Sequence, residues 1–165
     1  MKKIILVATF LISAFSYAQQ EIKLDVADAI GIRSLEFSYE TYINDVSSFG
    51  VSALFNLTKQ DAKFRYNENI MMTPYFRHYF TSEAQWNFFG EGFLGVNTGK
   101  KESIADSDTY DLKYTDAALG VAIGSKYIAE GGLTIDAYLG LGRNLFGSNS
   151  PILVPRLGLN VGWRF

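Results

Sequence analysis

The chain alternates apolar and polar residues with a period of two along most of its length. Alternation with this period places successive side chains on opposite faces of a β-strand, whereas an amphipathic helix repeats its apolar positions every three or four residues. Each alternating segment is therefore expected to be a strand with one apolar face. The eight segments are Glu21–Ile30, Arg33–Ile43, Phe49–Thr58, Ile70–Phe80, Trp86–Thr98, Tyr114–Ile128, Leu133–Arg143 and Ile152–Phe165.

The connections between these segments alternate in length. Short turns follow the second, fourth and sixth segments, whereas longer polar loops follow the third, fifth and seventh, at Lys59–Asn69, Gly99–Lys113 and Asn144–Pro151. Bacterial outer-membrane barrels show this asymmetry, with short periplasmic turns and longer outer loops. We therefore predict an all-β fold, an eight-stranded antiparallel up-and-down transmembrane β-barrel with both termini at the periplasmic side.

A soluble barrel or sandwich is the alternative architecture, because its strands would also alternate. Two observations favour the membrane barrel. The polar faces carry many glycines, such as Gly120, Gly124 and Gly158, which suits a narrow lumen. Trp86 and Trp163 lie near the predicted periplasmic ends, and Trp is enriched at membrane interfaces.

The first 18 residues have the pattern of a secretory signal peptide. Met1–Lys3 is positively charged, Ile4–Phe15 is apolar, and Ser16–Ala18 fits the small-residue cleavage pattern. A retained membrane anchor is the alternative, but the apolar run is short for a membrane span. We expect residues 1–18 to be a signal peptide and residues 19–165 to form one barrel domain.

Composition narrows the classes of function. The formal charge is −2, and removal of two Lys with the signal peptide makes it −4, which argues against nucleic acid as a partner. The chain has no Cys, so disulfides, thiolate metal sites and a Cys nucleophile are excluded. Hydrophobic residues make up 48% of the chain, yet the mature part has no long apolar run. This much apolar surface therefore requires a sheet.

Charged residues on the polar strand faces are expected inside the barrel. An eight-stranded barrel is narrow enough to be filled by side chains, and charges buried there must pair or stay hydrated. We interpret these residues as a charge network that plugs the lumen; a proton or ion path, or a carboxylate pair in acid–base catalysis, is the alternative. The predicted network comprises Glu36, Glu40, Arg77, Glu91, Asp116, Asp136 and Arg156, with Lys126 and Arg164 nearer the periplasmic end.

Known chemical motifs yield no catalytic, cofactor-binding or metal-binding residue. Gly90–Gly95 matches G-x-G-x-x-G, but it lies inside a predicted strand and not at a strand-to-helix turn. His78 is the only histidine, and we expect it to face outward without a hydroxyl and a carboxylate beside it. The acidic stretch Asp106–Asp111 lacks the complete calcium-loop pattern and its distal Glu.

The C-terminal residues Asn160–Phe165 resemble the aromatic-terminated signal that the barrel-assembly machinery recognises, with Trp163 and Phe165 as its aromatic members. The whole mature chain resembles the small OmpA/OmpX-type barrels. Pro74–Phe80 and Pro155–Phe165 are also similar to short outer-membrane barrels of unassigned function. The resemblance implies a Gram-negative outer membrane and contact with its lipid, its lipopolysaccharide and the assembly machinery. It carries over no catalytic residue and no cofactor.

The sequence therefore favours a monomeric, non-enzymatic outer-membrane protein with a structural or surface-interaction role. A lipid A-modifying enzyme is one alternative, and it would need a His with Ser and an acid near the outer rim, whereas the predicted topology places His78 near the periplasmic rim. A small-solute pore is the other alternative, and eight strands leave little lumen for it.

Overall fold

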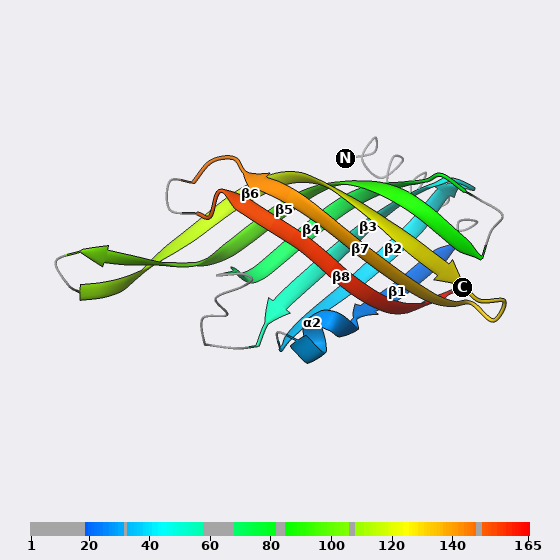
Figure 1. Cartoon of the computed structure of the whole chain (residues 1–165), viewed down its shortest axis with the longest axis horizontal. Helices are drawn as coiled ribbons and strands as arrows, with labels where there is room; N and C mark the ends of the chain where they lie inside the picture. The colour runs from blue at the N-terminus through cyan, green and yellow to red at the C-terminus, as the bar shows by residue number, and fades with distance from the viewer. Residues whose placement is uncertain (1–18, 32, 58–67, 82–84, 106–107, 148–149) are drawn as a thin grey trace, which may run out of the picture.

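The computed structural model of the chain describes residues 19–31, 33–57, 68–81, 85–105, 108–147 and 150–165. The described residues form eight antiparallel strands that close into a barrel in sequence order (Figure 1), which confirms the predicted fold. The strands are β1 (Gln20–Asp25), β2 (Ser34–Asn44), β3 (Ser47–Asn56), β4 (Glu68–Tyr79), β5 (Trp86–Ala105), β6 (Asp108–Ile128), β7 (Leu133–Asn144) and β8 (Leu153–Arg164). The predicted signal peptide, residues 1–18, lies outside the described residues.

The barrel closes where the last strand returns to the first. β8 pairs with β1 through five register pairs, from Glu21 opposite Arg164 to Asp25 opposite Asn160. The pairing continues to the last residue, because Phe165 donates its N–H to the carbonyl of Gln20 at 2.9 Å. The described chain thus begins and finishes at the same end of the barrel, which we call the terminal end.

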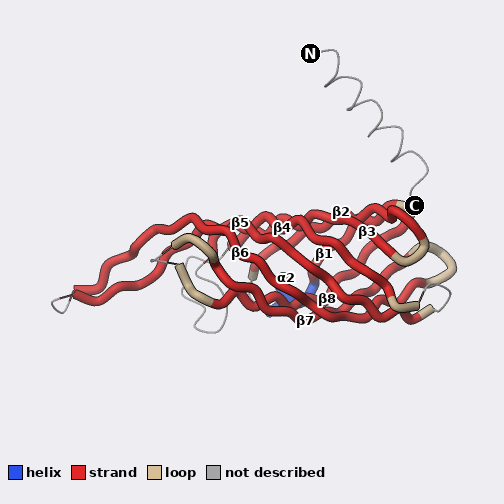
Figure 2. Tube along the Cα trace, turned by 90° about the horizontal axis from the view of Figure 1, so that it is seen from above, coloured by secondary structure: helices blue, strands red, loops and turns tan. Residues whose placement is uncertain are grey.

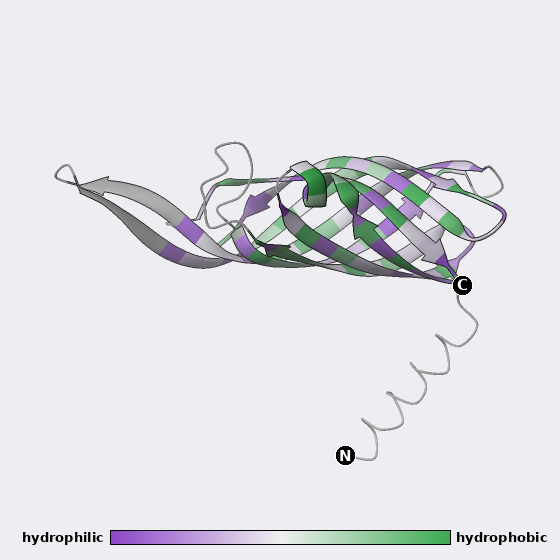
Figure 3. Cartoon of the chain, turned by 90° about the horizontal axis from the view of Figure 1, so that it is seen from below, coloured by the Kyte–Doolittle hydropathy of each residue, from purple (hydrophilic) through white to green (hydrophobic). Residues whose placement is uncertain are grey.

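The strand faces are apolar outside and polar inside. Val121 and Leu139 point outward and are 69% and 61% exposed, whereas Glu40 and Lys126 point inward and are fully buried. Figure 3 shows apolar and polar positions alternating along the wall. A soluble barrel has the reverse arrangement, with its apolar face in the core, so the outer wall of this barrel is suited to lipid.

The first strand is shorter than predicted. We expected a strand over Glu21–Ile30, but β1 stops at Asp25 and a short helix, α2 (Val26–Gly31), follows. The Asp25 side chain explains the change, because its Oδ1 accepts the N–H of Asp28 at 3.0 Å, which is the bond of a helix N-cap. α2 contacts β8 and β2, the two strands that flank β1. No described helix is long and apolar enough to cross a membrane.

A long hairpin replaces one of the predicted loops. We expected Gly99–Lys113 to be a loop, but β5 and β6 stay paired as far as Ala105 opposite Asp108. The two strands extend past the rest of the wall and project from the end of the barrel opposite the terminal end (Figures 1 and 2). We call this the hairpin end. The segment is rich in charged residues and lacks the period-two alternation used to predict strands, which is why its sequence resembled a loop.

Candidate functional site

The inner face of the barrel is filled by aromatic rings packed against glycines. An ideal Cβ on Gly50 would lie 2.3 Å from Cζ of Tyr75, and one on Gly120 would lie 2.3 Å from Cζ of Phe93. Three further buried aromatic residues face inward in the same way, namely Tyr79, Phe89 and Tyr138. The sequence pattern indicated the glycines but not these rings, although the rings share the strand parity of Arg77 and Glu91.

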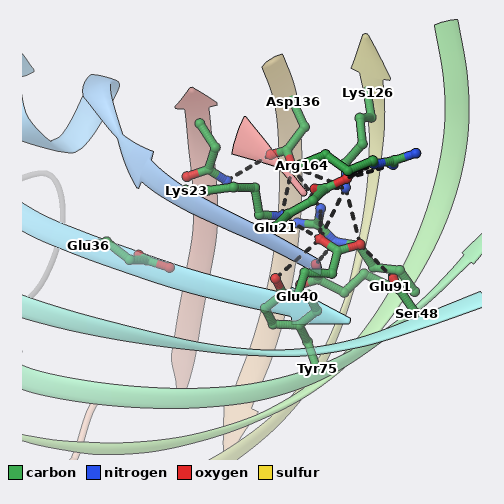
Figure 4. A network of polar contacts seen from close by, with 12 residues as sticks. Glu21, Lys23, Glu36, Glu40, Ser48, Tyr75, Glu91, Lys126, Asp136 and Arg164 are labelled. Atoms are coloured by element: carbon green, nitrogen blue, oxygen red, sulfur yellow. Dashed lines mark hydrogen bonds and ion pairs between the residues drawn. The ribbon is translucent and has the colours of Figure 1, made fainter. Parts of the chain in front are cut away.

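Glu40, on β2, is fully buried and lies among the other charged side chains of the interior (Figure 4). Its carboxylate accepts hydrogen bonds from Lys126 Nζ at 3.1 Å and from Arg77 Nη1 at 3.2 Å. Lys23 Nζ also donates to Oε2 of Glu40, and Ser48 Oγ donates to Oε1 at 2.6 Å. Three cations from three other strands therefore surround one fully buried carboxylate, which satisfies the requirement that a buried charge be paired.

Asp136, on β7, shares all three of these cations, and Lys126 is the most distant, with its Nζ 3.9 Å from Oδ2. Lys23 Nζ donates to its Oδ2 at 3.0 Å and Arg77 Nη1 donates to the same atom at 2.9 Å. The other carboxylate oxygen accepts Nδ2 of Asn160 at 2.7 Å. Lys23 and Arg77 thus bridge Asp136 to Glu40 across the interior of the barrel.

Arg77 extends the contacts toward the hairpin end. Its Nε donates to Oε2 of Glu91 at 2.7 Å, and Oε1 of Glu91 accepts Nε of Arg156 at 2.8 Å. Arg156 reaches Glu36 at 3.3 Å through Nη1. The guanidinium of Arg77 also lies 4.2 Å from the ring centroid of Phe89, so the aromatic filling stabilises the buried cation.

Glu21 extends the contacts toward the terminal end. Its Oε2 accepts Lys126 Nζ at 2.7 Å, and its Oε1 accepts Arg164 Nη2 at 2.6 Å. Five acidic and five basic side chains are thereby joined in one array, which we call the lumen network. Its members are Glu21, Glu36, Glu40, Glu91 and Asp136, together with Lys23, Arg77, Lys126, Arg156 and Arg164.

The structure places Asp116 in a different group of contacts from the one we predicted. Its carboxylate accepts the N–H groups of Phe146 at 2.9 Å and of Gly147 at 2.7 Å, and also the hydroxyl of Ser150. Asp116 therefore fixes the connection between β7 and β8 at the hairpin end, and none of the contacts described for it reaches a member of the lumen network. Glu21 and Lys23 take part in the network although the sequence pattern did not single them out.

The geometry of the lumen network suits a structural role. Every carboxylate in it contacts at least one cation, and all of its members except Arg164 are 4% exposed or less. General acid–base catalysis requires a carboxyl group within hydrogen-bond reach of a substrate. The side chains of Tyr75, Arg77 and Lys126 fill the space that a substrate or a hydrated ion would need at the level of Glu40.

His78 lies on the outer wall, as predicted, but it has a hydroxyl neighbour that the sequence did not reveal. Ser47 on β3 is the register partner of His78 on β4, and Ser47 Oγ lies 3.3 Å from Nδ1 of His78. The ring of Phe80 packs edge-on against the imidazole at 5.9 Å. The contacts described for His78 include no carboxylate, which a Ser-His-acid site requires.

The two aromatic residues of the predicted assembly signal both point away from the lumen. Trp163 is 53% exposed and Phe165 is 62% exposed. Trp163 is the register partner of Ile22 on β1 and of Leu133 on β7, so it lies at the closure of the barrel. Recognition by the assembly machinery stays a prediction.

The fold has known counterparts among solved structures, which were found by comparing structures and not sequences. No protein-family model matches the chain, and no curated protein matches its sequence. Among solved structures, the N-terminal β-barrel domain of Pseudomonas aeruginosa OprF superposes with a TM-score of 0.63 at 13% identity, covering 90% of this chain and 96% of that one. Neisserial surface protein A superposes with a TM-score of 0.54 at 14% identity, covering 90% and 94%. The chain has the fold of the eight-stranded outer-membrane barrels.

Proposed function

We propose that this protein is a non-enzymatic barrel of the bacterial outer membrane that presents the β5–β6 hairpin at the cell surface for interaction. The hairpin is the observation that carries the proposal, because it projects beyond the wall at the end opposite the chain termini. The apolar outer wall and the similarity to two outer-membrane barrels support the location. The filled lumen supports a role that depends on the surface of the protein and not on passage through it.

The lengths of the connections support an orientation with the terminal end at the periplasmic side, because β2 and β3, and likewise β6 and β7, are joined there by tight turns, as outer-membrane barrels have on that side. Aromatic residues mark a membrane boundary at this end. Trp86 and Tyr127 pack against each other at 5.1 Å, and Trp163 and Phe165 lie at the same end of the barrel. Such rings favour the boundary between lipid and water. In this orientation the partners are membrane lipid and lipopolysaccharide around the wall, and the barrel-assembly machinery during insertion. We further propose that the barrel is a monomer and binds no nucleic acid.

Two epitope tags test this topology. One tag is inserted between Ala105 and Asp108, at the hairpin, and the other after Glu130, in the turn between β6 and β7. Antibody should label the hairpin tag on intact cells and the turn tag only after the outer membrane is permeabilised. The reverse pattern would show that the barrel is inserted the other way, and recovery of both variants in the soluble fraction would refute membrane insertion.

The two alternative functions, a small-solute pore and a lipid A-modifying enzyme, predict different experimental results. A small-solute pore predicts stepwise conductance in planar bilayers, whereas a barrel filled by the lumen network should give none above the leak of the bilayer. The contact between Ser47 and His78 is the one observation that favours a lipid A-modifying enzyme. Lipid A should have the same mass in cells that carry the wild-type protein and in cells that carry His78→Ala. If the wild-type protein instead changed lipid A by an acyl chain and His78→Ala abolished that change, the enzyme would be favoured.

A further inference from the structure

A groove crosses the outer wall of the barrel from β3 to β8. Its volume is about 790 Å³, and Gly92 on β5 forms part of its floor. A Cβ added to Gly92 would meet nothing within 4 Å, so the missing side chain leaves the wall open at that point. Arg143 is the one charged residue among the described residues that line the groove. Its apolar borders include Phe49, Phe76, Leu119, Val121, Leu141 and Leu153.

The groove follows a row of positions that crosses the strands. Phe49 on β3 is the register partner of Phe76, and Phe76 is the partner of Gly92. Gly92 is in turn the partner of Val121, and Val121 is the partner of Leu141 on β7. Four strand spacings of about 4.8 Å make this row about 19 Å long. One leaflet accounts for about 15 Å of a hydrocarbon core about 30 Å thick, so one acyl chain has the length to lie along the row.

The row rises toward the hairpin end as it crosses the wall, because the strands of a barrel are tilted against the barrel axis. Phe49 lies near the start of β3, close to the terminal end, whereas Leu141 lies near the end of β7, close to the hairpin end. A lipid whose headgroup lies at the hairpin end can therefore extend a chain down the groove toward the terminal end.

Arg143 lies where the groove reaches the hairpin end. It is the next-to-last residue of β7 and the register partner of Leu119 and Leu153, and its side chain is exposed. The outward residues that precede it on β7, from Leu133 to Leu141, are all apolar. Its guanidinium forms no ion pair with a residue that the structure describes. An Arg on the lipid face costs little only near the membrane interface, where its planar fork can bind a phosphate through two hydrogen bonds.

We propose that the groove and Arg143 bind one molecule of lipid A, with an acyl chain in the groove and a phosphate on the guanidinium. The identity of the lipid rests on the proposed function, which places the hairpin end at the cell surface, where the outer leaflet consists of lipopolysaccharide. Lipid A carries acyl chains and phosphate groups on one sugar backbone, so it matches both the apolar groove and the cation at its upper end.

Native mass spectrometry of the mature barrel, released from detergent with increasing lipid A, tests the phosphate contact. We expect one tightly bound lipid A, and at least tenfold weaker binding by Arg143→Gln. Lipid A without its phosphates should bind the wild type and Arg143→Gln equally, because the guanidinium then has no phosphate to contact. Lys113→Gln removes an exposed cation outside the groove and should bind lipid A as the wild type does. Equal losses in the two variants, or a loss that persists with the dephosphorylated lipid, would overturn the contact.

Filling the groove tests the place of the acyl chain. Gly92→Leu puts a side chain into the groove, so lipid A with or without phosphates should bind at least several times more weakly. Ala137→Leu adds a leucine to the outer wall outside the groove and is the control. Equal binding by both variants would overturn the groove as the site, and equally tight binding of phosphatidylglycerol would overturn the choice of lipid A.

This experiment can fail independently of the proposed function. Binding in detergent does not depend on how the barrel is inserted, whereas the two epitope tags report only the insertion. Loss of lipid A binding would therefore overturn the lipid site even when the tags show the hairpin at the cell surface.

Discussion

Arg77 and Glu91 are register partners on β4 and β5, and the Nε of Arg77 lies 2.7 Å from Oε2 of Glu91. The contact joins the two halves of the lumen network, because Arg77 also reaches Glu40 and Asp136 while Glu91 also accepts Arg156. The ion pair between Arg77 and Glu91 therefore stabilises the interior, and the backbone register of β4 against β5 places the two residues opposite each other.

Replacing Glu91 with Ala should destabilise the barrel strongly. Arg77 and Arg156 would remain buried without the carboxylate that they share, and such uncompensated charge costs about 3–5 kcal/mol. Urea unfolding in detergent micelles, followed by tryptophan fluorescence, measures the change. Glu130→Ala in the exposed turn is the control and should differ from the wild type by about 0.5 kcal/mol or less. Equal stability of the two variants would indicate that water enters the lumen and hydrates the arginines.

A methyl group added inside the barrel should be harmful, and one added outside should not. The Cβ of Gly50→Ala would meet the ring of buried Tyr75 at 2.3 Å, and overpacking of this kind costs about 1–3 kcal/mol. Gly92→Ala places its Cβ on the outer wall, with nothing within 4 Å. The midpoint of heat-induced unfolding on gels should fall for the first variant only. A similar fall in both would mean that strand propensity, and not the aromatic ring, sets the effect.

Asp116→Ala should loosen one connection without unfolding the barrel. The N–H groups of Phe146 and Gly147 would lose their acceptor, a local cost of about 1–3 kcal/mol. Limited proteolysis should cleave the connection between β7 and β8 at least several times faster than in the wild type. Heat-modifiable migration of the uncleaved barrel should persist, and its loss would contradict a local role.

The projecting part of the hairpin should be dispensable for folding. Gly99 and Tyr114 are register partners, so residues 100–113 can be replaced by Asn-Gly, which forms a tight hairpin turn. We expect the shortened barrel to insert into outer membranes and to unfold within a few degrees of the wild type. Failure to assemble would show that the projecting strands guide folding of the wall. A normal barrel that no longer interacts at the cell surface would support the proposed function.

Period-two alternation predicted most of the fold because a membrane barrel exposes one face of every strand to lipid. The parity of Glu40 and Arg77 within their segments is enough to place both side chains in the lumen. The inward aromatic residues were not predicted. Tyr75 and Phe93 share the parity of Arg77 and Glu91, but an aromatic ring suits both lipid and a packed interior, so residue type did not single them out.

Two local features could not be read from alternation. Val26 and Ile30 keep the apolar parity of β1, so the change to α2 was not expected; it depends on the capping bond of the Asp25 side chain, which competes locally with strand pairing. The contact of His78 with Ser47 joins residues 31 positions apart in sequence and required the register of β3 and β4. Such a contact depends on which residues of neighbouring strands pair, and period-two alternation does not give this register.

β1 is attached to the molecule in an unusual way. It has only five register pairs with each neighbour, whereas β7 and β8 share eleven. Its side chains compensate, because Lys23 reaches β2 and β7, and Glu21 reaches β6 and β8, through the interior. The strand that closes the barrel is thus held from the inside by charge as much as by its backbone. In native-state hydrogen exchange, amides of β1 should respond to loss of Lys23 more than amides of any other strand do.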